Sequence, residues 1–341
     1  MTGKTIDTAL GKFSKEKFRA LVNVRETALH GLREALKEAG YTEVTTSTLV
    51  NIAGSCENPH ASFPVDYYGR EAHLSQSAQI QLEALVIRLK SGFFTVNNSF
   101  REENYDDPEA AGRRLSEFTL VEPERPYKGM HPGKALDRII EEQCRVVKHA
   151  TKKVLDSHAA DISLLGGNAN YLCNTIDSPF QRISYENTLR ILNRNSNRYR
   201  FGDDLGIKEE KKILAYFGNI PTFVTHYPAS IKFFNMKRMP DRRKVYNVDL
   251  LMPRLGETSG GAVREENGAR LKKQLVNSRI GKYISEKGQN PVAVFGEYLS
   301  LFKQERPLLR GGYGIGFERY VGFLLQSNDI LATIAYRTLK P

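Results

Sequence analysis

Arginine and glutamate residues recur at short spacing in one part of the chain, where they could handle a phosphorylated or carboxylate ligand. Arg101 and Glu103 lie two positions apart, so on an extended strand their side chains point to the same face. A guanidinium can hold a phosphate or carboxylate through two hydrogen bonds, and a nearby carboxylate can accept from an amine. The polar loop that follows leads to a second charged strand, 115–122, which predicts a hairpin. From these residues alone, a ladder of surface ion pairs is the alternative.

A glycine-rich run near the other end of the chain has a second pattern of this kind. Gly312, Gly314 and Gly316 alternate, which leaves one face of a strand bare for a planar or phosphorylated ligand. Arg319 follows closely, where such a ligand would carry charge. No βαβ unit follows, so a dinucleotide-binding fold is not indicated. Close packing of the strand is the alternative explanation for any single glycine.

Two carboxylates in a third segment could bind a cation. Asp249 closes a strand-like run, and Glu257 returns after a turn that contains Pro253 and Gly256. Carboxylate oxygens suit Mg²⁺, which commonly bridges to nucleotide phosphates. Alone, the pair is better explained as two solvated turn residues.

The elements that must position these groups follow from hydrophobic periodicity. The pattern predicts a mixed α+β fold, because it lacks a regular alternation of strands and helices, and the two strands joined by the polar loop favour antiparallel pairing. We expect helices at 15–39, 78–90, 134–156, near 265–276 and after the glycine run. We expect strands at 41–49, 93–101, 115–122, 222–226 and 244–251.

The composition narrows the class of protein. The chain has 341 residues, of which 40% are hydrophobic and 26% charged, as in an ordinary globular protein. The net charge of +11 fits a polyanionic partner such as RNA, a site for ATP phosphates, or merely a basic surface. The three cysteines form no C-x-x-C pair, so neither a zinc site nor a disulfide framework is indicated. Without a long apolar segment or a signal-peptide core, we expect a cytoplasmic protein.

In this order, the three segments resemble the signature motifs of class II aminoacyl-tRNA synthetases, in particular the asparaginyl/aspartyl group. Phe100-Arg101-x-Glu103 with Arg114-x-x-Glu117-Phe118 is similar to motif 2 of that family. Gly312-x-Gly314-x-Gly316-Phe-Glu-Arg319 is similar to motif 3. Gly256-Glu257-x-x-Gly260-Gly261-x-x-Arg264-Glu265 resembles the segment that binds metal and the substrate side chain. The likeness runs from about residue 15 to residue 337 and implies the class II fold, an α+β fold with an antiparallel β-sheet flanked by helices.

The resemblance implies a role for each matching residue in forming an aminoacyl-adenylate. Arg101 would bind the α-phosphate and the substrate carboxylate, and Arg319 would bind the γ-phosphate, which makes these two the catalytic arginines. The remaining roles fall into three sets. ATP would also contact Glu103, Arg114, Phe118 and Glu257; Mg²⁺ would bind Asp249 and Glu257; and the α-amino group would contact Ser77, Gln79 and Glu122.

The resemblance also bears on which amino acid is used. Arg264 matches the arginine that meets the carboxylate or amide oxygen of the substrate side chain. Members that use aspartate have a lysine at the position of Leu82, whereas Glu83 matches a glutamate of the asparaginyl branch that can accept from an amide. A carboxylate without a donor would disfavour an acidic substrate. We therefore expect asparagine, or a similar amide-bearing substrate, rather than aspartate.

Departures from the family pattern suggest a stand-alone relative. The likeness begins near residue 15, so we expect residues 1–14 to be an N-terminal extension, residues 15–341 to be the catalytic domain, and the anticodon-binding domain to be missing. Class II enzymes imply a homodimer, but Ser47 stands where motif 1 has a proline.

These features leave four functions open. The leading hypothesis is transfer of the activated amino acid to a non-tRNA acceptor, such as a small molecule or a peptide. The alternatives are an asparagine synthetase-like amidation of aspartyl-adenylate, which Leu82 disfavours, and tRNA aminoacylation, with which the positive charge is compatible. The last is a non-catalytic RNA- or protein-binding regulator, which would have no need of the complete ATP and metal set.

Overall fold

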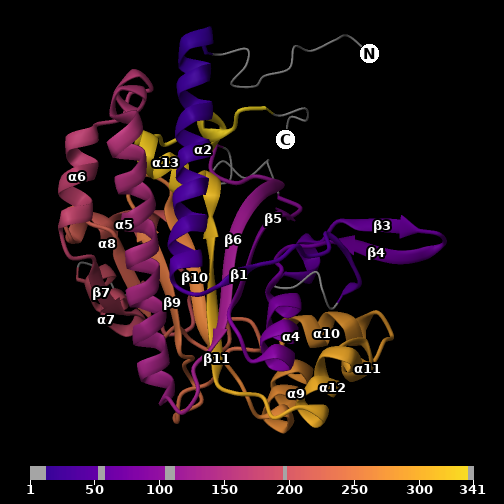
Figure 1. The fold of residues 1–341 in the computed structure, drawn as a ribbon. Coiled ribbons are helices and arrows are strands. Elements are labelled where there is room, and N and C mark those ends of the chain that lie inside the picture. Colours follow the sequence, from indigo (N-terminus) through magenta and orange to yellow (C-terminus); the bar gives the residue numbers. More distant parts are fainter. Residues whose placement is uncertain (1–12, 53–57, 104–111, 195–197, 337–341) are drawn as a thin grey trace.

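The computed structural model describes residues 13–52, 58–103, 112–194 and 198–336. Most of these residues surround one large sheet (Figure 1). Its eight strands lie in the order β1 (Thr42–Glu43), β5 (Phe93–Phe100), β6 (Glu117–Pro126), β11 (Arg310–Gly316), β10 (Gly256–Arg264), β9 (Asn247–Met252), β8 (Thr222–Thr225) and β7 (Gln181–Ser184). The predicted α+β class with a helix-flanked sheet is confirmed.

The six central strands are antiparallel, but both edges of the sheet are parallel pairs. β1 pairs with β5, and β7 pairs with β8. A parallel pair needs a long crossover connection, and each of these pairs has one. Helix α4 (Gln79–Leu89) lies within the first crossover, and α7 (Tyr185–Leu192) and α8 (Ile207–Tyr216) lie within the second. The antiparallel sheet expected from the sequence is present, with one parallel pair added at each edge.

One face of the sheet is covered by two long helices, α2 (Lys15–Glu38) and α5 (Pro132–Leu164). Ser14 caps α2 through a hydrogen bond from Lys17 N to Ser14 Oγ. The buried faces of both helices share one hydrophobic core with apolar residues from the central strands. Since side chains alternate along a strand, every second residue faces this core and the residues between them face the opposite side.

The remaining elements are shorter than α2 and α5. The remaining helices are α6 (Ala169–Asp177), α9 (Gly268–Val276), α10 (Arg279–Glu286), α11 (Pro291–Val294), α12 (Gly296–Gln304) and α13 (Phe317–Leu325), with 3₁₀ turns η1 (Pro59–Ala61) and η2 (Ile330–Thr333). Helices α9 to α12 form a separate group beside α4 (Figure 1). A second sheet contains β2 (Leu49–Val50), β4 (Arg70–Leu74) and β3 (Pro64–Tyr67), and its β3–β4 hairpin projects from the body.

Several element boundaries differ from those expected from the sequence. The run expected as one strand over 41–49 is divided between β1 and β2, which belong to different sheets. The segment 58–74, for which no strand was expected, contains the β3–β4 hairpin, whose turn places Tyr68 and Gly69 at positive φ. The turn expected after Asp249 joins β9 to β10 as a hairpin, and β10 was not among the expected strands. No helix among the described residues is long and apolar enough to span a membrane.

Candidate active site

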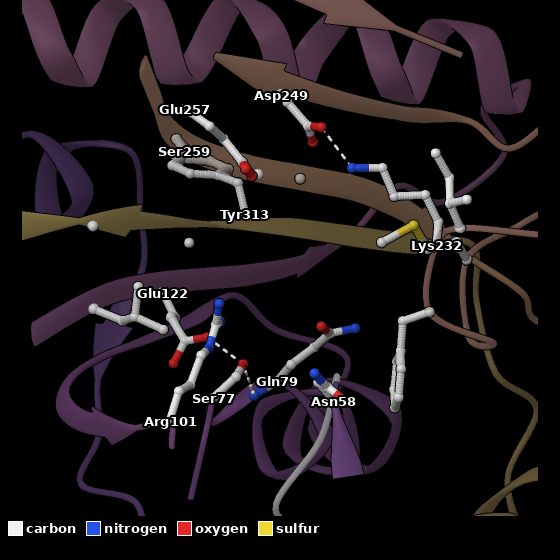
Figure 2. A pocket seen from close by; sticks show the side chains of 18 of the residues that line it. Asn58, Ser77, Gln79, Arg101, Glu122, Lys232, Asp249, Glu257, Ser259 and Tyr313 are labelled. Carbon is white, nitrogen blue, oxygen red and sulfur yellow. Dashed lines mark hydrogen bonds and ion pairs between the residues drawn. The ribbon is translucent and has the colours of Figure 1, made fainter. Parts of the chain in front are cut away.

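A cavity of about 920 Å³ opens on the face of the large sheet that α2 and α5 leave uncovered. Along β6, Val121 belongs to the core, while its neighbours Leu120 and Glu122 line the cavity. Along β9, Val248 and Leu250 belong to the core, while Asp249 lines the cavity. The same alternation that buries the apolar residues therefore collects the polar ones in a single site (Figure 2).

The ends of the β5–β6 hairpin bring four predicted ATP-binding residues to the cavity. Ser99 pairs with Phe118 across the hairpin, and Arg101 N donates to Ser116 O at 2.9 Å. The Arg101 guanidinium carbon lies 5.1 Å from the centre of the Phe118 ring. Arg114 Nη1 lies 3.1 Å from Glu103 Oε2. Arg101, Glu103, Arg114 and Phe118 all line the cavity, whereas residues 104–111 of the connecting loop lie outside the described part of the chain.

The second predicted catalytic arginine lies on the first turn of α13. Arg319 Nη1 donates to the backbone carbonyl of Glu257, which fixes the guanidinium at the cavity wall. Its neighbour Glu318 accepts from Thr119 N at 2.9 Å and from Arg25 Nη2 at 3.1 Å. Glu318 thus joins α13 to β6 and α2, and the start of α13 is held in place from both sides.

The glycines of β11 have two different environments, the cavity surface and a closely packed strand contact. Gly314 and Gly316 line the cavity, as expected for a bare strand face. Gly312 is instead closely packed, because a Cβ there would lie 2.1 Å from the carbonyl oxygen of Pro123. The alternation seen in the sequence therefore combines ligand access with strand packing.

The predicted metal-binding carboxylates, Asp249 and Glu257, lie close together beside Gly260 of β10. Asp249 pairs with Gly260 across the β9–β10 hairpin, and a bulge between Glu257 and Ser259 shifts the register. A Cβ on Gly260 would lie 3.2 Å from Glu257 Oε1 and 3.5 Å from Asp249 Oδ1. Two carboxylates facing one open space fit Mg²⁺, which keeps waters and substrate phosphates as its other ligands. Within the described ranges, no group of three or more His, Cys, Asp or Glu side chains gathers as a metal site.

A lysine that the sequence analysis did not single out also lies at the carboxylate pair. Lys232 Nζ is 2.5 Å from Asp249 Oδ2 and 4.1 Å from the centre of the Tyr227 ring (Figure 2). Burial lowers the pKa of Lys232, but the attraction of Asp249 and Glu257 outweighs burial, so the pKa is raised and the side chain stays cationic. No local sequence signal marks Lys232, because its partner is 17 positions away.

The residues expected to hold the substrate's α-amino group form a buried hydrogen-bonded set. Ser77 Oγ donates to Glu122 Oε1 at 2.5 Å, and Ala78 N donates to Glu122 Oε2 at 2.8 Å. Gln79 N donates to Ser77 Oγ at 3.1 Å. Ser77, Gln79 and Glu122 line the cavity. A carboxylate with two neighbouring polar side chains is a chemically suitable partner for an ammonium group.

The two residues expected to contact the substrate side chain, Arg264 and Glu83, differ in position. Arg264 lines the cavity, and its Nη2 lies 3.0 Å from Glu124 Oε2. Glu83 is fully buried and does not line the cavity, but Gln79, which does, donates to Glu83 Oε1 at 3.3 Å; its neighbour Leu82 also lines the cavity.

Glu83 is held by three side chains from distant segments. Its carboxylate accepts from Arg310 Nε at 2.8 Å, from the Tyr298 hydroxyl at 2.9 Å and from Asn235 Nδ2 at 2.5 Å. In this structure Glu83 is the internal partner of a buried arginine. Its contact with a substrate amide stays a prediction.

Comparison with known proteins agrees with this geometry. The chain matches the family described as tRNA synthetases class II (D, K and N) over residues 6–340. It is 33% identical over 325 residues to the asparagine–tRNA ligase of Pyrococcus abyssi, covering 94% of this chain and 69% of that protein. It is 31% identical to a probable cytoplasmic asparagine–tRNA ligase of Schizosaccharomyces pombe, covering 91% of this chain and 51% of that protein.

A solved structure shows the same similarity in three dimensions. The asparaginyl-tRNA synthetase of Pyrococcus horikoshii, complexed with asparaginyl-adenylate, superposes with a TM-score of 0.81 at 31% identity. The alignment covers 94% of this chain and 68% of that one. The prediction of an adenylate-forming ligase is confirmed by these relationships. The chain belongs to the class II tRNA synthetase family, as an asparaginyl-tRNA synthetase-like catalytic domain.

Proposed function

We propose that this protein uses ATP and Mg²⁺ to activate asparagine as asparaginyl-adenylate and passes the asparaginyl group to an acceptor other than tRNA. One observation carries the activation step. A single cavity collects the arginines, the converging carboxylates and the buried set of Ser77, Gln79 and Glu122. The first two groups suit a triphosphate with its metal, and the third suits an α-amino group.

The residues present can perform adenylation by positioning and charge stabilisation. An oxygen of the substrate carboxylate attacks the α-phosphorus of ATP, the bond to the β-phosphate oxygen breaks, and pyrophosphate leaves. Arg101 is placed to stabilise the charge that develops at the α-phosphate, and Arg319 to hold the distal phosphate. Mg²⁺ held by Asp249 and Glu257 would supply neutralisation of the phosphates. Ser77 and Glu122 orient the amino acid, which keeps its carboxylate aimed at the phosphorus.

Two features favour an amide-bearing substrate over aspartate. The apolar Leu82 lines the cavity at the position where a lysine would attract a second carboxylate. Arg264 already neutralises Glu124, so its attraction for an additional anion is reduced. Two of the relatives described above are named asparagine–tRNA ligases, which points to the same amino acid.

Amino-acid-dependent exchange of labelled pyrophosphate into ATP tests the activation step. Asparagine should support exchange well above aspartate. Exchange with none of the standard amino acids would refute activation of asparagine, and exchange with aspartate alone would reverse the substrate assignment.

Aminoacylation of tRNA is a second candidate for the transfer step. The names of the relatives and the net charge of +11 favour it. Incubation of the protein with labelled asparagine and total tRNA separates the two candidates, because acid-precipitable label above background would replace the non-tRNA acceptor with tRNA.

We further propose that residues 15–341 act as one catalytic domain after an extension at 1–14, and that the protein is a cytoplasmic homodimer. Ser47, at the position of the motif 1 proline, exchanges two hydrogen bonds with the Gln81 side chain, at 2.8 and 2.9 Å. These two hydrogen bonds support an ordered backbone at Ser47, although no proline restricts it there. Light scattering of the purified protein measures the oligomeric state, and a monomeric mass would refute the dimer.

A further inference from the structure

The cationic side chains that line the cavity differ in whether they contact other groups of the protein. Nine arginine and lysine residues within the described ranges line it. Six of them contact other groups of the protein: Arg101 with Phe118, Arg113 with the Leu255 carbonyl, Arg114 with Glu103, Lys232 with Asp249, Arg264 with Glu124, and Arg319 with the Glu257 carbonyl.

The other three cations come from two segments of the cavity wall. Arg238 follows the segment that carries Lys232, while Arg279 and Lys282 lie on the first turn of α10. Arg279 and Lys282 are three positions apart, so they project from the same side of that helix. In the part of the chain that the structure describes, Arg238, Arg279 and Lys282 make no ion pair and no side-chain hydrogen bond. We call these three residues the basic rim.

The backbone that carries the basic rim is held by specific contacts. Gln274 Nε2 donates to the Phe234 carbonyl at 2.6 Å, which fixes α9 against the segment leading to Arg238. Ser278 Oγ donates to the Leu275 carbonyl at 2.6 Å and accepts from Gly281 N at 3.1 Å. Gly281 is required in this turn, because a Cβ there would lie 2.1 Å from the Leu275 carbonyl oxygen. The charges are thus presented on a preorganised support.

The basic rim lies outside the groups that the adenylate would use. The nucleotide is expected at Phe118 and Arg319, and the amino acid at Ser77 and Arg264. Like charges gathered at a cavity without acidic partners repel one another unless an anion joins them. The cavity must also admit the nucleophile that consumes the adenylate.

We propose that the basic rim binds an anionic group, carboxylate or phosphate, of a small amine that accepts the acyl group. This inference rests on the proposed adenylation and specifies its acceptor. The amine nitrogen attacks the carbonyl carbon of the adenylate, a C–N bond forms, and the bond from that carbon to the phosphate oxygen breaks. AMP leaves with the electron pair, and the nitrogen loses one proton to water.

Three amines test the proposal: n-propylamine without an anion, β-alanine with a carboxylate, and O-phosphoethanolamine with a phosphate. Each is added to the full-length protein with ATP, asparagine and pyrophosphatase, and AMP release and amide formation are measured. At least one anionic amine should react about fivefold faster than propylamine, since one exposed ionic contact is worth up to about that much. The anionic amine that reacts faster shows whether the basic rim prefers a carboxylate or a phosphate.

The variant Arg279→Ala/Lys282→Ala should lose this preference and approach the propylamine rate. Pyrophosphate exchange reports separately on adenylation. The matched control is Lys272→Ala/Lys303→Ala, which removes two exposed lysines of the same helical group that do not line the cavity. Equal rates for the three amines, or an unchanged preference in the rim variant, would overturn the proposal, as would transfer to tRNA with none to the anionic amines.

Calorimetric titration with O-phosphoethanolamine and with β-alanine separates this inference from the proposed function. If exchange fails but the wild-type protein binds either probe and the rim variant does not, the anion site stands and adenylation falls. If neither probe binds the wild-type protein, or the rim variant binds them equally well, the anion site is refuted whatever the exchange assay shows.

Discussion

Lys232 Nζ and Asp249 Oδ2 lie 2.5 Å apart at the point where the carboxylates expected to hold Mg²⁺ converge. A lysine side chain therefore already neutralises one of the two carboxylates. A divalent cation that binds Asp249 and Glu257 must share this charge or displace it. The affinity of the site for metal is then a balance between an internal ammonium and an external ion.

Replacing Lys232 with methionine should strengthen binding of a divalent cation in the absence of nucleotide. The change removes the competing charge and keeps most of the apolar volume, so the Kd for Mn²⁺ should fall by roughly tenfold. Electron paramagnetic resonance of free Mn²⁺ measures this Kd. Lys272→Met, on the exposed face of α9, serves as the control. An unchanged or weaker affinity would show that Lys232 does not compete with the metal.

Arg319→Ala should nearly abolish pyrophosphate exchange while leaving the protein folded. The guanidinium is placed to stabilise phosphate charge, and loss of one such group reduces rates by roughly 100- to 1,000-fold. Exchange rates should be compared with circular dichroism of the same preparation. Lys272→Ala should behave like the wild type in both measurements. Exchange near the wild-type rate would mean that Arg319 does not contact the phosphates.

Glu83→Gln should destabilise the protein rather than alter substrate preference alone. Arg310 is fully buried, and removing its carboxylate partner leaves a charge without compensation, at a cost of about 3–5 kcal/mol. Urea unfolding gives the change in free energy. The double variant Glu83→Gln/Arg310→Met should recover part of that loss, because the uncompensated charge is removed. Wild-type stability together with a selective loss of asparagine activation would instead place Glu83 in the substrate pocket.

Glu210 should make stability depend on pH. Burial, assisted by repulsion from Glu257, raises the pKa of Glu210 from 4.5 to about 7. The folded protein then binds a proton that the unfolded chain releases, so the free energy of unfolding is highest below pH 4.5 and falls as pH rises through about 7. The full loss is about 3 kcal/mol.

Glu210→Gln supplies the matched comparison for this pH effect, because the amide oxygen can still accept from Glu257 N, the donor at 2.9 Å in the structure. Urea unfolding of both proteins at about pH 5 and about pH 8 measures the difference. A decline with pH that is equally steep in the variant would assign the effect to another group.

Much of the site followed from local sequence. The β5–β6 hairpin, the apolar helix after the glycine run and the cavity positions of Arg101, Glu103, Phe118 and Arg319 were predicted from spacing, composition and the family resemblance. Such features depend on periodicity and on residues close together in the chain, which the sequence records directly.

The tertiary structure decided which charges meet. Lys232 reaches Asp249 across 17 positions, Glu83 meets Arg310 across 227, and Arg264 meets Glu124 across 140. No local pattern encodes such pairs, because the register of nonadjacent strands and the crossovers around them bring the partners together. The sequence alone therefore determined the family and the mixed fold, and it supplied the candidate ATP-binding residues. Only the folded chain showed that Glu83 is held by a buried arginine and that the basic rim has no acidic partner among the described residues.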